Sequence, residues 1–273
     1  MLGYGLGLRS PHIQQFLKDR PKDVAWLEII SENYMRAHAG YRAMLDDLRR
    51  DYPIVLHGVS LNIGSTDPLN MDYLKELKAL ADALETPHIS DHLCYTGLAH
   101  SNTHDLLPIP YTEEALAHIV PRIHALQEIL GRAFVFENAS SYLEFNGTTM
   151  SESEFLADLH KQTGCGILLD VNNVYVSSYN HGWDAKAYID AIPTSAIKQY
   201  HLAGHTNKGS HIIDTHNDHV TDEVWDLFRY TISTKGENTA MIEWDADIPP
   251  FDVLLSEINK ARSIAATTLR EAA

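Results

Sequence analysis

Eight short apolar runs, separated by longer helical stretches, are the feature that most constrains how this chain can fold. Each run is bounded by polar or turn residues, which is typical of a strand buried in a parallel sheet. The runs are GYGLGLR from Gly3, VAWLEII from Val24, PIVLH from Pro53, HISDHL from His88, AFVFE from Ala133, GILLD from Gly166, IKQYH from Ile197 and AMIEW from Ala240.

The stretches between these runs have apolar residues three and four positions apart, as amphipathic helices do. Examples are YRAMLDDLRR from Tyr41, MDYLKELKALADALE from Met71 and EEALAHIVPRIHALQEIL from Glu113. Alternating strands and helices specify a parallel sheet, and eight repeats in 273 residues favour closure into a barrel. We therefore predict an α/β fold, a (β/α)8 TIM barrel that forms a single domain over residues 1–273.

Two stretches lack a helical or strand pattern, and we expect both to be irregular. They are TGLAHSNTHDLLPIPYT after the fourth run and AGHTNKGSHIIDTHNDHV after the seventh. Long loops that follow barrel strands usually carry function.

Composition narrows the function and the location. The chain has 21 Lys and Arg against 37 Asp and Glu, and a net charge of -16 repels nucleic-acid backbones. No signal-peptide pattern opens the sequence, and no run has the roughly 20 apolar residues that a membrane span needs. We expect a cytoplasmic protein without nucleic-acid or membrane partners, in which the distant Cys94 and Cys165 are reduced thiols.

Ionisable residues stand at or near the carboxyl end of one apolar run after another. A single residue of this kind is usually a hydrogen-bonded structural group. The same position repeated in six strands instead indicates a shared functional site. Because all strands of a parallel barrel end at one rim, these side chains should converge on one pocket. The six residues are His57, His92, Glu137, Asp170, His201 and Glu243.

A dry cluster of carboxylates and imidazoles is costly, because like charges repel and burial penalises each charge. Bound cations remove this cost. Imidazole and carboxylate ligands without a thiolate suit iron, manganese or zinc, and one Glu can bridge two ions. The pattern therefore predicts a site for more than one metal ion, with no catalytic residue expected beyond the metal ligands.

Further candidate ligands lie in segments that we expect to be loops at the same rim: Asn173, His181, Asp214 and His216. Asp214 and His216 are separated by one residue, so an extended backbone would place both side chains on the same side as a small chelate. Residues that could support the ligands or contact substrate are Glu28, Glu32 and Asn33.

Taken together, several segments resemble the multinuclear non-heme iron-dependent oxidative enzymes, a former domain-of-unknown-function family that includes the methanobactin and thiaglutamate biosynthesis oxidases. The resemblance covers nearly the whole chain and implies a TIM barrel, xylose isomerase-like in architecture. The segments are LEIISENYM, VLHGVSLNIGS, ISDHLCYTG, LLPIPYTEEAL, FVFENASSYL, GILLDVNNVYVSSYNHG, HLAGHT and IIDTH.

The resemblance implies two or three iron ions, as a mixture of Fe(II) and Fe(III), with dioxygen as co-substrate. It also implies that the substrate is a cysteine-containing, ribosomally synthesised precursor peptide, usually presented by a partner protein. By position, it assigns a first ion to His57, His92 and a bridging Glu137, a second to Asp170, His201 and Glu243, and a third to Asn173, His181, Asp214 and His216.

Two other functions remain open on the sequence. One is a zinc- or manganese-dependent hydrolase or isomerase resembling the endonuclease IV and xylose isomerase barrels, for which turnover without dioxygen would be the sign. The acidic charge counts against the endonuclease form of this alternative. The other is a non-catalytic module that stores metal or binds a peptide without changing its mass.

Overall fold

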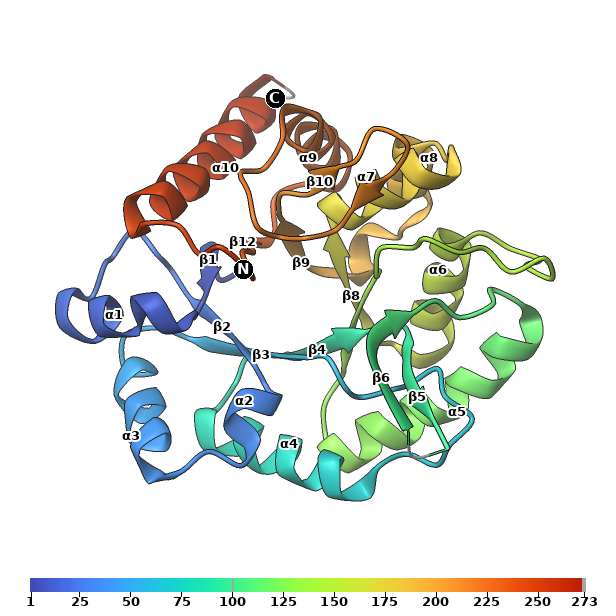
Figure 1. Cartoon of the computed structure of the whole chain (residues 1–273), viewed down its shortest axis with the longest axis horizontal. Coiled ribbons are helices and arrows are strands. Elements are labelled where there is room, and N and C mark those ends of the chain that lie inside the picture. Colours follow the sequence, from blue (N-terminus) through green and yellow to red (C-terminus); the bar gives the residue numbers. More distant parts are fainter. Residues whose placement is uncertain (100, 272–273) are drawn as a thin grey trace.

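The computed structural model describes residues 1–99 and 101–271, and its centre is a closed barrel of eight parallel strands (Figure 1). The eight predicted strands are all present, which confirms the predicted TIM barrel. Each strand pairs with the barrel strands before and after it, and β12 closes the ring against β1. The strands are β1 Tyr4–Gly7, β2 Leu27–Ile30, β3 Ile54–Gly58, β4 Ile89–His92, β7 Val135–Glu137, β8 Gly166–Asp170, β9 Ile197–Leu202 and β12 Thr239–Ile242.

The helices surround the barrel (Figure 1). In α4, Leu74, Leu77 and Leu84 are buried, as the apolar spacing predicts. None of the described helices combines the length and apolar character that crossing a bilayer requires. The helices are α1 Ile13–Asp19, α2 Glu32–Met35, α3 Ala39–Leu48, α4 Met71–Leu84, α5 Glu113–Leu130, α6 Glu152–Thr163, α7 Val171–His181, α8 Ala185–Ala191, α9 Asp222–Lys235 and α10 Phe251–Glu271, with 3-10 turns at Ser10–His12 and Thr194–Ala196.

Helix α7 corrects one prediction, because it contains Asn173 and His181, which we expected on loops. The helix begins directly after β8, where the Asp170 side chain accepts a hydrogen bond of 2.6 Å from the backbone N–H of Asn173. Such a cap satisfies a free N–H of the first turn. Gly182, at φ 75°, ends the helix in the left-handed conformation that glycine tolerates best.

The two stretches predicted to be irregular each contain a short antiparallel hairpin, so that prediction is wrong for part of each. In the first, β5 Tyr95–Leu98 pairs with β6 Ser101–Leu107, and residue 100 lies outside the described residues. In the second, β10 Thr206–Asn207 pairs with β11 Ile212–Ile213. The strands β10 and β11 have two residues each, and β6, although seven residues long, has the mainly polar sequence SNTHDLL. Neither hairpin therefore shows an apolar run in the sequence.

The barrel interior has an apolar lower layer beneath a polar upper layer. Trp26, Val55 and Met241 form a small core of their own, apart from the large core that packs the helices onto the barrel. Side chains two positions apart on a strand point to the same face. The residues two positions after these three therefore also point inward, and they are Glu28, His57 and Glu243.

Replacement of Gly5 by alanine tests this packing. The new methyl group would overlap the Trp26 indole, so we expect the free energy of unfolding to fall by about 1–3 kcal/mol, as for other overpacked cores. Gly147→Ala is the matched control, because no described atom lies within 4 Å of its added methyl group. Equal stability of the two variants in denaturant titrations would contradict the packing described here.

Candidate metal centre

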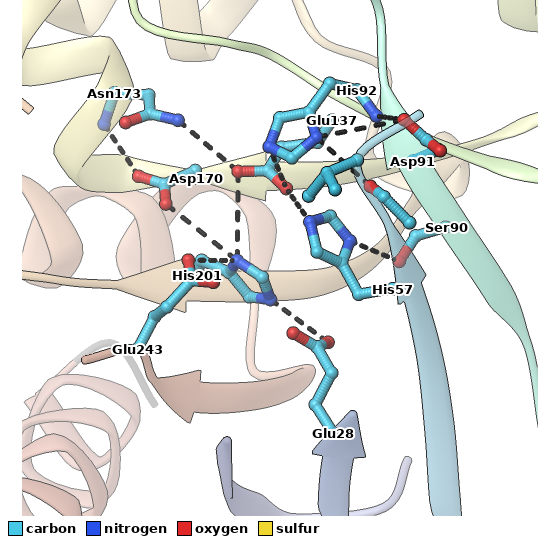
Figure 2. Close-up of polar contacts among 12 residues, drawn as sticks. Glu28, His57, Ser90, Asp91, His92, Glu137, Asp170, Asn173, His201 and Glu243 are labelled. Atoms are coloured by element: carbon cyan, nitrogen blue, oxygen red, sulfur yellow. Dashed lines mark hydrogen bonds and ion pairs between the residues drawn. The ribbon is translucent and has the colours of Figure 1, made fainter. Parts of the chain in front are cut away.

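The six strand-end residues meet at the carboxyl end of the barrel, where their side chains point toward one another (Figure 2). The register of the sheet brings these residues to the same level of the barrel. His92 pairs with Glu137 across β4 and β7, and Asp170 pairs with His201 across β8 and β9. All six side chains are buried. The convergence expected from strand ends is therefore what the barrel produces.

The first group of possible ligands is His57, His92 and Glu137. The Nε2 atoms of the two rings lie 3.2 and 3.6 Å from Oε2 of Glu137. On the far side of each ring, Nδ1 of His57 is 2.8 Å from the Ser90 hydroxyl and Nδ1 of His92 is 3.2 Å from the Gly58 carbonyl. Nδ1 of each ring therefore carries a proton, and each Nε2 faces the carboxylate, where it offers a lone pair to a metal ion once the ring is neutral.

The second group shares Glu137 and adds Asp170, His201 and Glu243. Nδ1 of His201 lies 3.0 Å from Glu243, 3.8 Å from Glu137 Oε1 and 3.9 Å from Asp170 Oδ2. Glu137 thus turns one oxygen toward each group. A carboxylate in this position can bridge two cations.

Glu28 fixes the ring of His201 from below. Nε2 of His201 is 3.2 Å from the Glu28 carboxylate, which also accepts a hydrogen bond of 2.7 Å from the Gln199 amide. Although burial raises it, the nearby His201 ring lowers the pKa of Glu28 below its ordinary value. The Gln199 amide nitrogen lies 2.7 Å from the same Nε2 atom, and, although burial acts to lower it, Glu28 and Glu243 raise the pKa of His201 well above its ordinary value. An ionised Glu28 favours a proton on Nε2, so that Nδ1 would be the atom that faces the second group when the ring binds a metal ion.

Several buried polar atoms at this rim have no hydrogen bond of good geometry within the described part of the chain, although some of them lie within ion-pair distance of one another. Buried polar atoms usually have a well-aligned partner. Ligand atoms about 2.0–2.2 Å from a shared ion lie roughly 3 Å from one another, close to the separations found here. These atoms therefore fit a metal centre better than a purely hydrogen-bonded one. They are Glu137 Oε2, Asp170 Oδ2, Asn173 Oδ1, His201 Nδ1 and His216 Nε2.

The protonation states of the site are strongly displaced. Burial raises the pKa of Glu137 to about 8 and that of Asp170 to about 6, and it lowers the pKa of His57 to about 4. Burial also acts to lower the pKa of His92, but Glu137 and Asp91 raise it to about 9. Without cations the cluster therefore holds protons that bound metal would displace.

A third group joins His216 to Glu243 and Asp245. Nδ1 of His216 lies 3.3 Å from Glu243 and 3.2 Å from Asp245, and its Nε2 lies 2.6 Å from Asp214. Asp214 and His216 are adjacent as predicted, but the backbone is not extended, because His216 has a φ of 45°. Asp245 is the most exposed member of this group, with 42% of its side chain accessible.

Asp245 and Arg9 also lie at this site, although neither was predicted from the sequence. Arg9 bonds to Asp245 and lies 3.7 Å from Glu243, so it places a positive charge beside the third group. Both residues had a signal in the sequence. Asp245 follows Glu243 by two positions, the spacing of side chains on one face of a strand, and Arg9 follows the first apolar run.

The predicted third group of Asn173, His181, Asp214 and His216 is not assembled as a unit. Asn173 donates to Glu137 at 3.3 Å and so lies beside the second group. His181 belongs to none of the three groups that the described residues form. Eight positions of α7 separate the two residues, which is about 12 Å along a helix axis. His181 instead pairs with Ser141 and stacks on Trp183, with ring centroids 4.8 Å apart.

Comparison with known proteins identifies the family. The sequence profile of the family described as "RiPP precursor modification enzyme MbnB/TglH/ChrH" matches residues 3–266. The chain belongs to this family. A UPF0276 protein of Anaeromyxobacter sp. (strain Fw109-5) is 49% identical over 98% of this chain and 95% of its own length. A UPF0276 protein of Caulobacter vibrioides (strain NA1000 / CB15N) is 46% identical over 96% of this chain and 93% of its own length.

Solved structures agree on the fold. L-ribulose 3-epimerase superposes with a TM-score of 0.65 at 12% identity, over 100% of this chain and 97% of that protein. A fusion protein of a xylose isomerase-like TIM barrel with 4-hydroxyphenylpyruvate dioxygenase superposes with a TM-score of 0.68 at 11% identity, over 99% of this chain and 44% of the fusion. At such identities the likeness shows the xylose isomerase-like barrel alone.

The support that Glu28 gives to His201 can be measured through metal affinity. Glu28→Gln keeps the volume of the side chain but removes the charge that holds the ring proton, so we expect zinc affinity to fall about 10–100-fold. Competition with a chromophoric chelator gives the affinity. Glu128→Gln, at an exposed position of α5, should bind zinc as the parent does. Unchanged zinc affinity in Glu28→Gln would refute this role.

The displaced pKa values predict how metal stabilises this family member as pH changes. The pKa of Glu137 rises from 4.5 to about 8, so the stability that its protonated form contributes is lost as pH rises through about 8. Metal must displace that proton, so binding strengthens over the same range. We expect the difference in Tm between zinc-loaded and metal-free protein to widen from pH 6 to pH 8 in thermal melts. A gap that stays constant or narrows would be inconsistent with protonated ligands.

Proposed function

We propose that this chain is an iron-dependent, dioxygen-using oxidase that modifies cysteine residues of a ribosomally synthesised peptide. The observation that carries the proposal is Glu137, whose two oxygens face two separate groups of imidazole and carboxylate ligands. Membership of a family of peptide-modifying enzymes supports a peptide as the substrate. Ligands of nitrogen and oxygen without sulfur suit iron in more than one oxidation state.

Each residue has a distinct part in this proposal. His57, His92 and Glu137 would hold one ion, and Glu137 with Asp170, His201 and Glu243 would hold a second. Asn173, which donates to Glu137, positions the shared carboxylate. His216 and Glu243, with Asp214 or Asp245, provide for a third ion, and we assign His181 no metal.

Iron in these positions would take electrons from the peptide cysteine and pass them to dioxygen, which is the chemistry that the metal supplies when bound. The protein keeps the ligand rings in fixed tautomers and excludes water from their far sides. Ser90, the Gly58 carbonyl and Glu28 do this by occupying the ring nitrogens that face away from the ions. Ligands fixed in advance bind metal without first having to reorient.

The same proposal includes a cysteine-containing peptide as substrate and a partner protein that presents it. A peptide must present its thiolate at the barrel mouth, and a partner protein that presents the peptide would supply binding energy outside the metal centre. The formal charge of -16 favours a peptide or partner with basic residues. The carboxylates of the mouth, once balanced by cations, no longer repel an approaching thiolate.

The test is anaerobic reconstitution with iron, followed by dioxygen and a cysteine-containing precursor peptide. We expect dioxygen to be consumed in proportion to the amount of peptide whose mass changes. Zinc-loaded protein should show neither dioxygen consumption nor a mass change, and the same holds for a peptide with serine in place of cysteine. Glu137→Gln should lose at least about a hundredfold in turnover, because one change disturbs two ions. Failure to bind iron, or equal turnover with zinc and no dioxygen, would refute the proposal and favour a hydrolase or isomerase.

A further inference from the structure

A hollow of about 450 Å³ lies beside the metal centre, between α6, α8 and the segment that follows β7. Its walls are mainly apolar and aromatic, and nothing in the metal chemistry uses it. The residues that matter for what it could hold are Tyr111, Leu143, Phe145, Glu152, Trp183 and Tyr188.

The segment that follows β7 connects this hollow with the rim of the metal centre. The Ser140 hydroxyl donates to Asp214 of the metal centre at 3.0 Å, whereas the next residue, Ser141, lines the hollow. His181 holds this segment through a 2.9 Å hydrogen bond to the Ser141 carbonyl. The hollow and the metal centre therefore share this segment as a common wall.

The wall of the hollow contains a carboxyl group that forms no ion pair with the described residues. Glu152, in the first turn of α6, is 3% exposed and accepts a hydrogen bond of 2.8 Å from the Tyr111 hydroxyl. The buried Tyr188 hydroxyl lies beside the same carboxyl group. Burial raises the pKa of Glu152 to about 7, so a cationic ligand would stabilise its ionised form.

The charges around the hollow are all of one sign. Its described lining residues include no lysine or arginine. They include four acidic residues, which are Glu144, Glu152, Glu154 and Asp184. Glu154 and Asp184 also accept hydrogen bonds at the starts of α6 and α8. Trp183 and Phe145 also line the hollow, and aromatic rings of this kind attract cations.

We propose that this hollow binds a lysine or arginine side chain of the precursor peptide, with Glu152 as the partner of its charge and the aromatic walls around its aliphatic part. The inference rests on the proposed function, because it takes a peptide to be the substrate. It adds a specificity element, a basic residue near the modified cysteine, and assigns its recognition to residues outside the metal centre.

The test measures binding of two otherwise identical peptides by calorimetry. One contains lysine and the other contains norleucine, and serine replaces cysteine in both, so that no reaction occurs. We expect the lysine peptide to bind about tenfold or more tightly than the norleucine peptide, as a charged hydrogen bond to a buried carboxylate would provide. Glu152→Gln should lose this preference, whereas the surface control Glu128→Gln should keep it.

A second variant keeps the test decisive if Glu152→Gln does not fold. Ala187 is exposed and lines the hollow, so Ala187→Phe would fill the space without touching the carboxylate. It should also abolish the preference for lysine. Equal binding of the two peptides to the parent protein, or a preference that survives in the folded variants, would overturn the inference.

These outcomes are separate from those of the oxidase proposal. The binding measurement depends neither on iron nor on dioxygen, so a lost preference in the variants stands even if iron reconstitution yields no oxidation. Conversely, an active iron enzyme that binds both peptides equally would overturn only the assignment of the hollow.

Discussion

Mutual repulsion between buried carboxylates is the constraint on which the rest of this structure depends. Glu137, Asp170 and Glu243 lie almost out of contact with water within one cluster, where each ionised group raises the cost of ionising the next. Protons on Glu137 and charge on the imidazoles can balance the metal-free cluster, and cations can do so in their place. The barrel therefore maintains an arrangement that is unfavourable by itself and becomes favourable through binding.

The ligand geometry is tied to the fold through groups that serve two purposes. Asp170 uses one oxygen to cap α7 and leaves the other without a hydrogen bond in the cluster, so the position of the helix and of the ligand are set together. Glu28 likewise orients His201 from the layer just above the apolar core of the barrel. Because these supports belong to strands and helix ends rather than to mobile loops, the ligands are held in place before an ion arrives.

The sequence was informative wherever one local rule decided the position of a side chain. Apolar runs predicted all eight barrel strands, and residues at their ends predicted the cluster, because parallel strands leave no choice about which rim they share. His181 shows the limit of that reasoning. Its distance from the cluster depends on the eleven-residue length of α7 and on the path of the segment around Ser141. Both are set by tertiary structure and not by a local sequence pattern. The contact between Arg9 and Asp245 likewise depends on tertiary packing, although the position of each residue near a strand end could be read from the sequence.

His181 supports the segment that lies between the metal centre and the neighbouring hollow. By holding Ser141, it fixes a wall whose neighbouring residue, Ser140, contacts Asp214 of the metal centre. One side of this wall carries clustered ligands, and the other carries apolar surface with a single deeply buried acid, Glu152. Chemistry and recognition would then be supplied by different residues, so that the hollow could change with the peptide while the ligands stayed the same. A histidine assigned by sequence to metal would contribute instead to selectivity, through the wall that it supports.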